Sequence, residues 1–280
     1  MLSALQKTSY LQNGFLVLPN FKSADKIAAV RARAQQIVEA FDPGEQKSIF
    51  TTSEQVRTVD RYFLDSADQV HCFFEEEAFS AHGQLRQAKA LSINKIGHAL
   101  HDRDPVFDAF SHGPKLADLA FDLGLVSPQV WQSMYIFKQP GIGGEVNWHQ
   151  DATFFDTTPI SVTTFWFALE DAMQDNGCLW AEPGGHRGPL RERFVRHENI
   201  VSMQKLDATP WPSASGTAVP LEVHAGSLVV FHGLLPHYSA PNRSATSRQA
   251  YTLHVTDAST VYAATNWIQR NASFPVRGFI

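Results

Sequence analysis

The sequence predicts a mainly β domain, either a sandwich or a jelly roll, with helices packed against it, and three observations support this prediction. From Val130 onward, short runs of β-branched and aromatic residues alternate with Gly, Pro and Asn breaks, which is typical of many short strands joined by turns. Before Leu125, apolar residues recur mainly at helical spacing. The length of 280 residues and the hydrophobic content of 44% allow one large domain with a substantial core.

The N-terminal region is predicted to contain a helix, a strand and a second helix. The first helix covers Ser3–Asn13 and ends at Gly14, and the apolar run Phe15–Pro19 follows it as a strand. Ser23 is placed to cap the second helix, whose apolar residues recur at helical spacing until the break at 42–44. This helix is therefore expected to pack one apolar stripe on a sheet.

The pattern over residues 45–125 is mixed. Arg61–Leu64 is consistent with a short strand, and three consecutive glutamates beginning at Glu75 favour a solvated charge cluster. We expect no chemistry within residues 45–87. Over residues 91–125 the apolar spacing returns and predicts two or three helices.

The C-terminal half is predicted to form the β core. Strands are expected at Gln132–Phe137, Ile160–Ala168, Cys178–Ala181, Val219–Val223, Ser227–Phe231 and Arg248–Val255. The segment Asp207–Pro220 is rich in Pro, Ser and Ala, so it is predicted to be a loop inserted in the β core, where loops often shape the entrance of a substrate site. We therefore expect a single domain over residues 1–280, with helical support at 1–125 and a β core at 130–256.

Composition and charge exclude several classes of protein. The net charge of -5, the pI near 6.2 and the lack of a basic run argue against nucleic acid or a membrane as a partner. Cys72 and Cys178 are far apart and are expected to be reduced thiols. The first ten residues lack a targeting pattern, and the C-terminus is not a peroxisomal address. We expect a cytoplasmic protein that acts on a small-molecule substrate, and the sequence carries no signal for an oligomeric state.

His149 and Asp151 are candidate metal ligands. They stand two residues apart in a β-prone stretch, and on a strand this spacing directs both side chains to one face. An imidazole and a carboxylate side by side supply two of the three donors of the 2-His-1-carboxylate site, which binds non-haem Fe(II). The alternative interpretation is an ordinary pair of surface residues on a strand.

The second histidine of such a site would have to come from further along the chain. The candidates are His224, His232 and His237. We favour His237 because Ser239 shares its face and because Arg248 lies one strand and turn away. His232 is more simply interpreted as a histidine of the core or of a loop.

Arg248 would have a chemical purpose beside this metal. If the co-substrate is 2-oxoglutarate, its keto-acid end chelates Fe(II) while its far carboxylate requires a planar bidentate cation, which arginine supplies better than lysine. The alternative for Arg248 is a surface ion pair.

Several stretches of the chain resemble the phytanoyl-CoA dioxygenase family of Fe(II)/2-oxoglutarate oxygenases, in particular its domain-containing protein 1 type. Besides His149-x-Asp151, His237 and Arg248, the matching strings are Ser92–Leu100, Gln132–Pro140, Gly144–Val146, Asn176–Trp180 and Ser247–Thr252. Together they span most of the chain. The resemblance implies a double-stranded β-helix, that is, a cupin-like jelly roll, with flanking helices.

The resemblance also implies the site residues and the reaction. His149, Asp151 and His237 would be the catalytic metal ligands for Fe(II), with O2 and 2-oxoglutarate as co-substrates. The residues lining the 2-oxoglutarate site would be Lys95, Met134, Trp166, Ser239 and Arg248. By pattern alone, Met134 and Trp166 would be assigned to the core. The implied activity is a 2-oxoglutarate-dependent dioxygenase that hydroxylates a small organic substrate and releases succinate and CO2.

Two other functions remain open at this point: a non-catalytic jelly-roll binding protein with a vestigial site, and a metal-dependent hydrolase or isomerase with the same ligands. The complete ligand set argues against the first, and no acid/base partner is identifiable for the second. A long acyl-CoA is not expected as substrate, because the loop Asp207–Pro220 has no basic residue for the CoA phosphates. The nearby basic cluster is predicted to be a solvated helix face and comprises Arg187, Arg191, Arg193 and Arg196.

Overall fold

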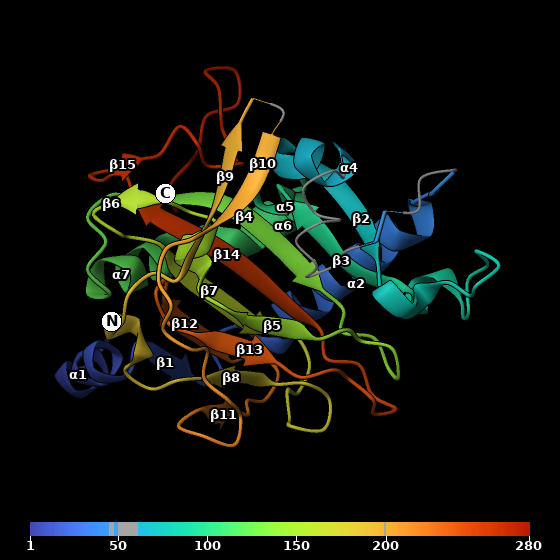
Figure 1. Ribbon diagram of the computed structural model, residues 1–280, viewed down its shortest axis with the longest axis horizontal. Helices are drawn as coiled ribbons and strands as arrows, with labels where there is room; N and C mark the ends of the chain where they lie inside the picture. Colours follow the sequence, from blue (N-terminus) through green and yellow to red (C-terminus); the bar gives the residue numbers. More distant parts are fainter. Residues whose placement is uncertain (45–47, 50–60, 199) are drawn as a thin grey trace.

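The computed structural model describes residues 1–44, 48–49, 61–198 and 200–280. Within them, two antiparallel sheets form the body of the molecule (Figure 1). The larger sheet has seven strands in the order β1-β12-β7-β14-β4-β3-β2, and the smaller has four in the order β11-β8-β13-β5. Strands distant in sequence are neighbours in both sheets, which is typical of a jelly roll.

The strands of the larger sheet are β1 Phe15–Leu18, β2 Val70–Phe74, β3 Ile93–His98, β4 Pro128–Ile136, β7 Thr163–Ala168, β12 Leu228–His232 and β14 Ala250–Asp257. Those of the smaller sheet are β5 Val146–His149, β8 Leu179–Ala181, β11 Val219–Leu221 and β13 His237–Ser239. Two further ribbons pair β9 Glu192–His197 with β10 Ile200–Lys205, and β6 Thr157–Thr158 with β15 Val261–Tyr262. Apolar residues of both main sheets, such as Val229 and Leu179, share one buried cluster between them.

The helices are α1 Ala4–Asn13, α2 Ala24–Ala40, α4 Arg61–Leu64, α5 Leu100–Arg103, α6 Pro105–Ser111 and α7 Pro114–Asp122. Local chemistry explains their ends. Ser3 and Gln6 form a reciprocal capping box at the start of α1, and Gly14 ends it in a left-handed conformation. Asp104 caps α6 by accepting hydrogen bonds from two backbone amides, directly before Pro105.

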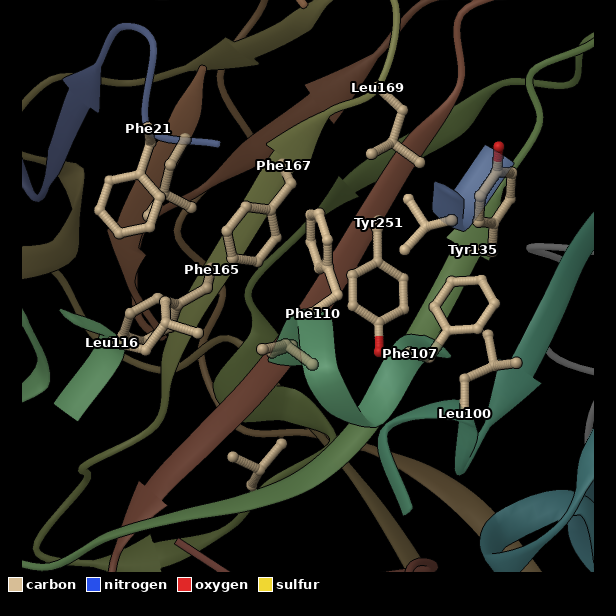
Figure 2. Packing of buried hydrophobic residues seen from close by; sticks show 14 of the residues in the cluster. Phe21, Leu100, Phe107, Phe110, Leu116, Tyr135, Phe165, Phe167, Leu169 and Tyr251 are labelled. Carbon is tan, nitrogen blue, oxygen red and sulfur yellow. The ribbon is translucent and has the colours of Figure 1, made fainter. Parts of the chain in front are cut away.

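One face of the larger sheet is covered by helices. On that face, Phe107 and Phe110 of α6 pack against Tyr251 of β14 and Phe167 of β7 (Figure 2). The rings of Phe110 and Phe167 meet edge to face with centroids 5.1 Å apart, which is a favourable aromatic geometry. This packing anchors the sheet from one side and leaves its opposite face turned toward the smaller sheet.

The predicted fold class is confirmed, and so are the first helix, the first strand and the second helix. Ser23 stands at the N-cap position of α2 but makes no side-chain capping hydrogen bond. No helix among the described residues is both long and apolar enough to cross a membrane.

Three local predictions were wrong. Arg61–Leu64 is the short helix α4 and not a strand. Residues Ile93–His98, predicted as helical, form strand β3, because hydrogen bonding to β2 on one side and β4 on the other outweighs the local apolar spacing. The basic cluster is not a helix face: Arg193 and Arg196 lie on β9, and Arg191 is buried just before it.

Candidate active site

Three metal-binding side chains converge between the two sheets. His149 ends β5 and His237 begins β13, and the two residues are direct partners in the register of these strands. Asp151 follows β5 at the start of a 3₁₀ turn, Asp151–Thr153. Its Oδ1 lies 3.6 Å from Nε2 of His149 and 3.7 Å from Nε2 of His237. One donor atom from each of the three residues lies within 4.8 Å of the donor atoms of the other two, so the group could hold a metal ion.

The placement of Asp151 differs from the strand geometry that the sequence suggested. The strand ends at His149, so the carboxylate reaches the site through the turn and not by alternation along β5. Its second oxygen accepts a short hydrogen bond from the hydroxyl of Thr164 on β7. A residue of the larger sheet therefore holds in place the carboxylate of Asp151, which lies in the turn that follows a strand of the smaller sheet.

Both histidines are oriented by backbone carbonyls. Nδ1 of His149 lies 2.8 Å from the carbonyl oxygen of Asn147, and Nδ1 of His237 lies 3.0 Å from that of Leu235. A carbonyl oxygen only accepts, so each Nδ1 carries the proton and each Nε2 presents its lone pair toward Asp151. This is the tautomer that binds a metal through Nε2.

Asp151 is buried, yet it is held in the charged form. Burial by itself raises the pKa of Asp151, but the positive charges that His237, His254 and His149 carry when protonated, with a hydrogen bond to His254, outweigh it, so the net pKa lies well below its usual range. His254 on β14 places Nε2 3.6 Å from the same carboxylate oxygen. An ionised carboxylate beside two neutral imidazole nitrogens is a suitable donor set for a divalent cation.

The other two candidate histidines lie elsewhere. His232, at the end of β12, accepts a hydrogen bond from the backbone amide of Leu234, and burial lowers its pKa to about 4. His224 is exposed and pairs with Asp171. Of the three, only His237 is brought into the group with His149 and Asp151.

Arg248 is buried at the opposite end of the same cavity. Its side chain is 1% exposed; Nε donates to the carbonyl of Gly177 at 3.0 Å, and Nη2 donates to the hydroxyl of Ser239 at 3.1 Å. Among the described residues, Nη1 has no hydrogen-bond partner and no carboxylate forms an ion pair with the guanidinium. Burial lowers the pKa of Arg248 to about 10, which keeps the group charged at neutral pH. A buried cation without a counter-ion is costly, so this end of the cavity fits an anionic ligand.

The remaining residues predicted for the co-substrate site lie between Arg248 and the three ligands. Met134 on β4 and Trp166 on β7 both flank Thr252 of β14 in the sheet register, and the ring of Trp166 lies 5.3 Å from the guanidinium carbon of Arg248. Lys95 on β3 places its Nζ 3.9 Å from Sδ of Met134. All these side chains line a cavity of about 540 Å³ that also contains the three ligands.

Comparison with known proteins identifies the family. The sequence profile named phytanoyl-CoA dioxygenase (PhyH) matches residues 10–250. The chain belongs to the phytanoyl-CoA dioxygenase family. It is 48% identical over 259 residues to a phytanoyl-CoA dioxygenase of Arabidopsis thaliana, covering 92% of this chain and 90% of the relative. It is 44% identical over 284 residues to phytanoyl-CoA dioxygenase domain-containing protein 1 of Mus musculus, covering 98% and 97%. The resemblance drawn from the sequence is confirmed.

Solved structures share the fold at lower identity. The carbocyclase SnoK from nogalamycin biosynthesis, described as non-heme and alpha-ketoglutarate dependent, superposes with a TM-score of 0.65 at 19% identity, covering 98% of this chain and 96% of SnoK. EctD from S. alaskensis, solved with 2-oxoglutarate and 5-hydroxyectoine, gives a TM-score of 0.62 at 20% identity, covering 94% and 78%. At these identities the likeness shows the jelly-roll fold.

This member of the family has buried charges that the sequence did not single out. Glu75, assigned to a solvated cluster, is instead buried and lines the cavity, where it accepts hydrogen bonds from Asn94 at 2.7 Å and from the amide of Gly144 at 3.1 Å. Lys138 donates to the carbonyl oxygens of Gly144 at 2.7 Å and Ser239 at 3.3 Å. Burial, with help from the charge of Arg248, lowers the pKa of Lys138 well below its ordinary value. No sequence pattern distinguishes Glu75 from the two glutamates beside it.

His254 and Thr164 were also missed, although one signal could have found His254. Residues 248, 250, 252 and 254 share one face of the strand predicted at Arg248–Val255, because side chains alternate along a strand. If Arg248 faces the cavity, His254 is expected to do so as well. No such signal points to Thr164, because its hydrogen-bond partner Asp151 lies in a turn that follows a strand of the other sheet.

Proposed function

We propose that this protein is an Fe(II)- and 2-oxoglutarate-dependent oxygenase that hydroxylates a small organic substrate, with release of succinate and CO2. The observation that carries the proposal is the pairing, in one cavity, of a 2-His-1-carboxylate group with a buried arginine whose Nη1 lacks a partner among the described residues. The first fits a metal with open coordination positions, and the second fits the far carboxylate of a dicarboxylic acid.

In this proposal His149, Asp151 and His237 hold the iron. Bound Fe(II) would supply the activation of O2 and the redox chemistry. The residues of the chain supply position and charge. The backbone carbonyls that bond each Nδ1 fix the histidine rings, and Thr164 fixes the carboxylate, so the donors are oriented before the metal binds.

The co-substrate is assigned to the other end of the cavity. Arg248 and the hydroxyl of Ser239 would bind the far carboxylate of 2-oxoglutarate, while Lys95, Met134 and Trp166 would line its chain. Lys138 sits behind Ser239 and holds its carbonyl, which keeps the hydroxyl next to the guanidinium. Burial of these groups excludes water and strengthens each charge-assisted contact.

Family membership supports the general class, and the complete donor set argues against a vestigial binding protein. Neighbours in structure are named as a carbocyclase and as an epimerase, and product analysis distinguishes hydroxylation from either reaction. A cytoplasmic location, and the absence of nucleic acid and membranes as partners, stay predictions from the sequence.

The test is succinate formation by iron-loaded protein in the presence of 2-oxoglutarate and O2, together with metal content before and after reaction. We expect slow succinate formation in the absence of a prime substrate, and its loss together with iron in Asp151→Ala. A wild-type protein that binds iron but neither binds nor decarboxylates 2-oxoglutarate would contradict the proposal. A matched control is Asp156→Ala, which changes a nearby carboxylate that pairs with Arg193.

A further inference from the structure

The cavity continues beyond the metal ligands into a second region, which we call the substrate chamber. Its described lining residues include Phe63, His98, Gln132, Phe155, Glu192 and Trp267. The chamber lies on the far side of the metal group from Arg248. In the sheet register, Gln132 of β4 and Thr164 of β7 are both partners of His254, which lies within β14. Arg248, by contrast, lies before the start of β14. In the proposed function, this is where the molecule to be oxidised would bind.

Gln132 is a polar side chain that lines the substrate chamber. It lies on β4, is 5% exposed, and faces the cavity directly opposite His254, whose Nε2 is 3.6 Å from Asp151. Nδ1 of His254, its partner in the strand register, is buried and has no hydrogen-bond partner among the described residues. Buried polar atoms are normally hydrogen-bonded, so an unpartnered one that faces a cavity beside the Gln132 carboxamide indicates a place for a ligand's polar group.

The walls of the chamber are flat and aromatic. The rings of Phe63 and Trp267 stack with centroids 4.7 Å apart, and His98 meets both edge to face. A second pair is formed by Phe155, which stacks on His254 with centroids 4.9 Å apart. These rings are held by one another, so they form preorganised surfaces for a ring-bearing molecule.

The cations that line the cavity lie at one of its ends. The cations among its described lining residues are Lys95, Lys138 and Arg248, and all three belong to the co-substrate end. Apart from histidine and the metal ligand Asp151, the ionisable residue of the substrate chamber is Glu192, an acid. Among these lining residues an anionic group would find no counter-ion and would meet a like charge. The guanidinium of Arg191, outside the lining, lies 4.6 Å from the ring of Trp211 and pairs with Glu182.

We propose that Gln132 selects and orients the prime substrate, and that this substrate is an uncharged, ring-bearing small molecule with a carboxamide or lactam group. The inference rests on the proposed function. A carboxamide carries both a donor and an acceptor, so the Gln132 amide and a substrate amide can form two hydrogen bonds side by side. That contact would hold the substrate next to the metal group while its ring lies between the aromatic walls. The same charges disfavour the phosphates of an acyl-CoA thioester inside the chamber.

The test uses benzamide and benzoate, which have nearly the same shape and differ in charge. Binding is measured by quenching of tryptophan fluorescence, since Trp211 and Trp267 line the chamber, in protein loaded with Mn(II) and 2-oxoglutarate without O2. We expect benzamide to bind at least tenfold more tightly than benzoate or benzoyl-CoA. Equal or tighter binding of either anion, or no binding of benzamide, would overturn the proposed substrate class.

Two variants test Gln132 itself. Gln132→Leu keeps the size of the side chain and removes both hydrogen-bonding groups, and Gln132→Glu keeps an acceptor but removes the donor. Both should raise the benzamide Kd about tenfold or more, the effect expected when a buried polar contact is lost. The control is Gln129→Leu, the same change on the same strand but outside the cavity lining, which should leave the benzamide Kd unchanged. Thermal unfolding of the three variants checks that each one folds.

The affinity for 2-oxoglutarate separates this inference from the proposed function. If Gln132→Leu weakens 2-oxoglutarate tenfold and leaves benzamide unaffected, Gln132 belongs to the co-substrate site and the inference is wrong while the proposed function stands. If wild-type protein binds no 2-oxoglutarate and forms no succinate, the proposed function fails, whatever the benzamide result. A raised benzamide Kd with a 2-oxoglutarate Kd close to that of wild type supports both.

Discussion

The two faces of the seven-stranded sheet differ in chemistry although the same strands build them. On β14, Tyr251 packs against the helices (Figure 2), and it shares one buried apolar cluster with Leu253. Thr252 and His254, the residues between and after them, point into the cavity, where each has a buried polar atom without a partner among the described residues. Side-chain alternation with a period of two thus separates a face that stabilises the fold from a face that is left ready for ligands.

The difference teaches that this sheet concentrates its unsatisfied groups where ligands are expected. Buried polar atoms without hydrogen-bond partners cost free energy. Those of Thr252 and His254 lie on β14, and that of Arg248 lies two residues before the strand. The helix-covered face offsets this cost through close packing of large rings. Substitutions on the helix-covered face should consequently lower the free energy of unfolding, whereas substitutions on the cavity face should mainly change metal or ligand binding.

The largest effect is expected at the metal ligands of the cavity. His237→Ala should lower Fe(II) affinity by more than the roughly 10- to 100-fold that loss of a ligand's hydrogen-bonding partner costs, and turnover should disappear. Anaerobic Fe(II) titration and succinate assays measure both. His232→Ala is the matched control, since His232 lies outside the ligand group. The assignment fails if His237→Ala keeps wild-type affinity and His232→Ala loses it.

On the helix-covered face, Leu253→Ala should reduce the free energy of unfolding by about 2–5 kcal/mol, because Leu253 is fully buried in the apolar cluster. Denaturant unfolding followed by circular dichroism measures it. A loss below about 1 kcal/mol would show that this face is packed more loosely than the contacts indicate.

At the entrance of β14, Arg248→Lys should raise the KM for 2-oxoglutarate about ten- to a hundredfold, the equivalent of ~1.5–3 kcal/mol for a charge-assisted bidentate contact. Metal content should stay the same. Arg243→Lys, an exposed arginine that pairs with Glu77, is the control and should leave KM unchanged. An unaltered KM in Arg248→Lys would remove the arginine from the co-substrate site.

The smallest effect is expected from Thr252→Val, the neighbour of Leu253 on the opposite face. The hydroxyl of Thr252 is buried and has no partner within the described residues, so its replacement by a methyl group should raise the free energy of unfolding by about 1 kcal/mol in the absence of ligand. The same denaturant experiment detects it. A destabilisation comparable to that of Leu253→Ala would erase the proposed difference between the two faces.

How far the sequence reaches is clearest at the ligands themselves. His149 and Asp151 were found as a pair because they stand two residues apart, yet the strand that justified the pairing ends at His149. The grouping was therefore right and its geometry was not. His237 could be favoured over His224 and His232 because Ser239 shares its face and Arg248 lies one strand and turn away, and the family resemblance implied the same residue.

By itself, the sequence determined the fold class, the ends of the first helices, the family and the residues with the strongest chemical signature. Periodicity, caps and turn residues are local, so they can be recognised along the chain. Only the tertiary structure decided that Ile93–His98 is a strand, that Glu75 and Lys138 are buried beside the cavity, and that Gln132 faces His254. These facts depend on which distant strand lies opposite, and pairing between residues far apart in sequence leaves no local pattern to read.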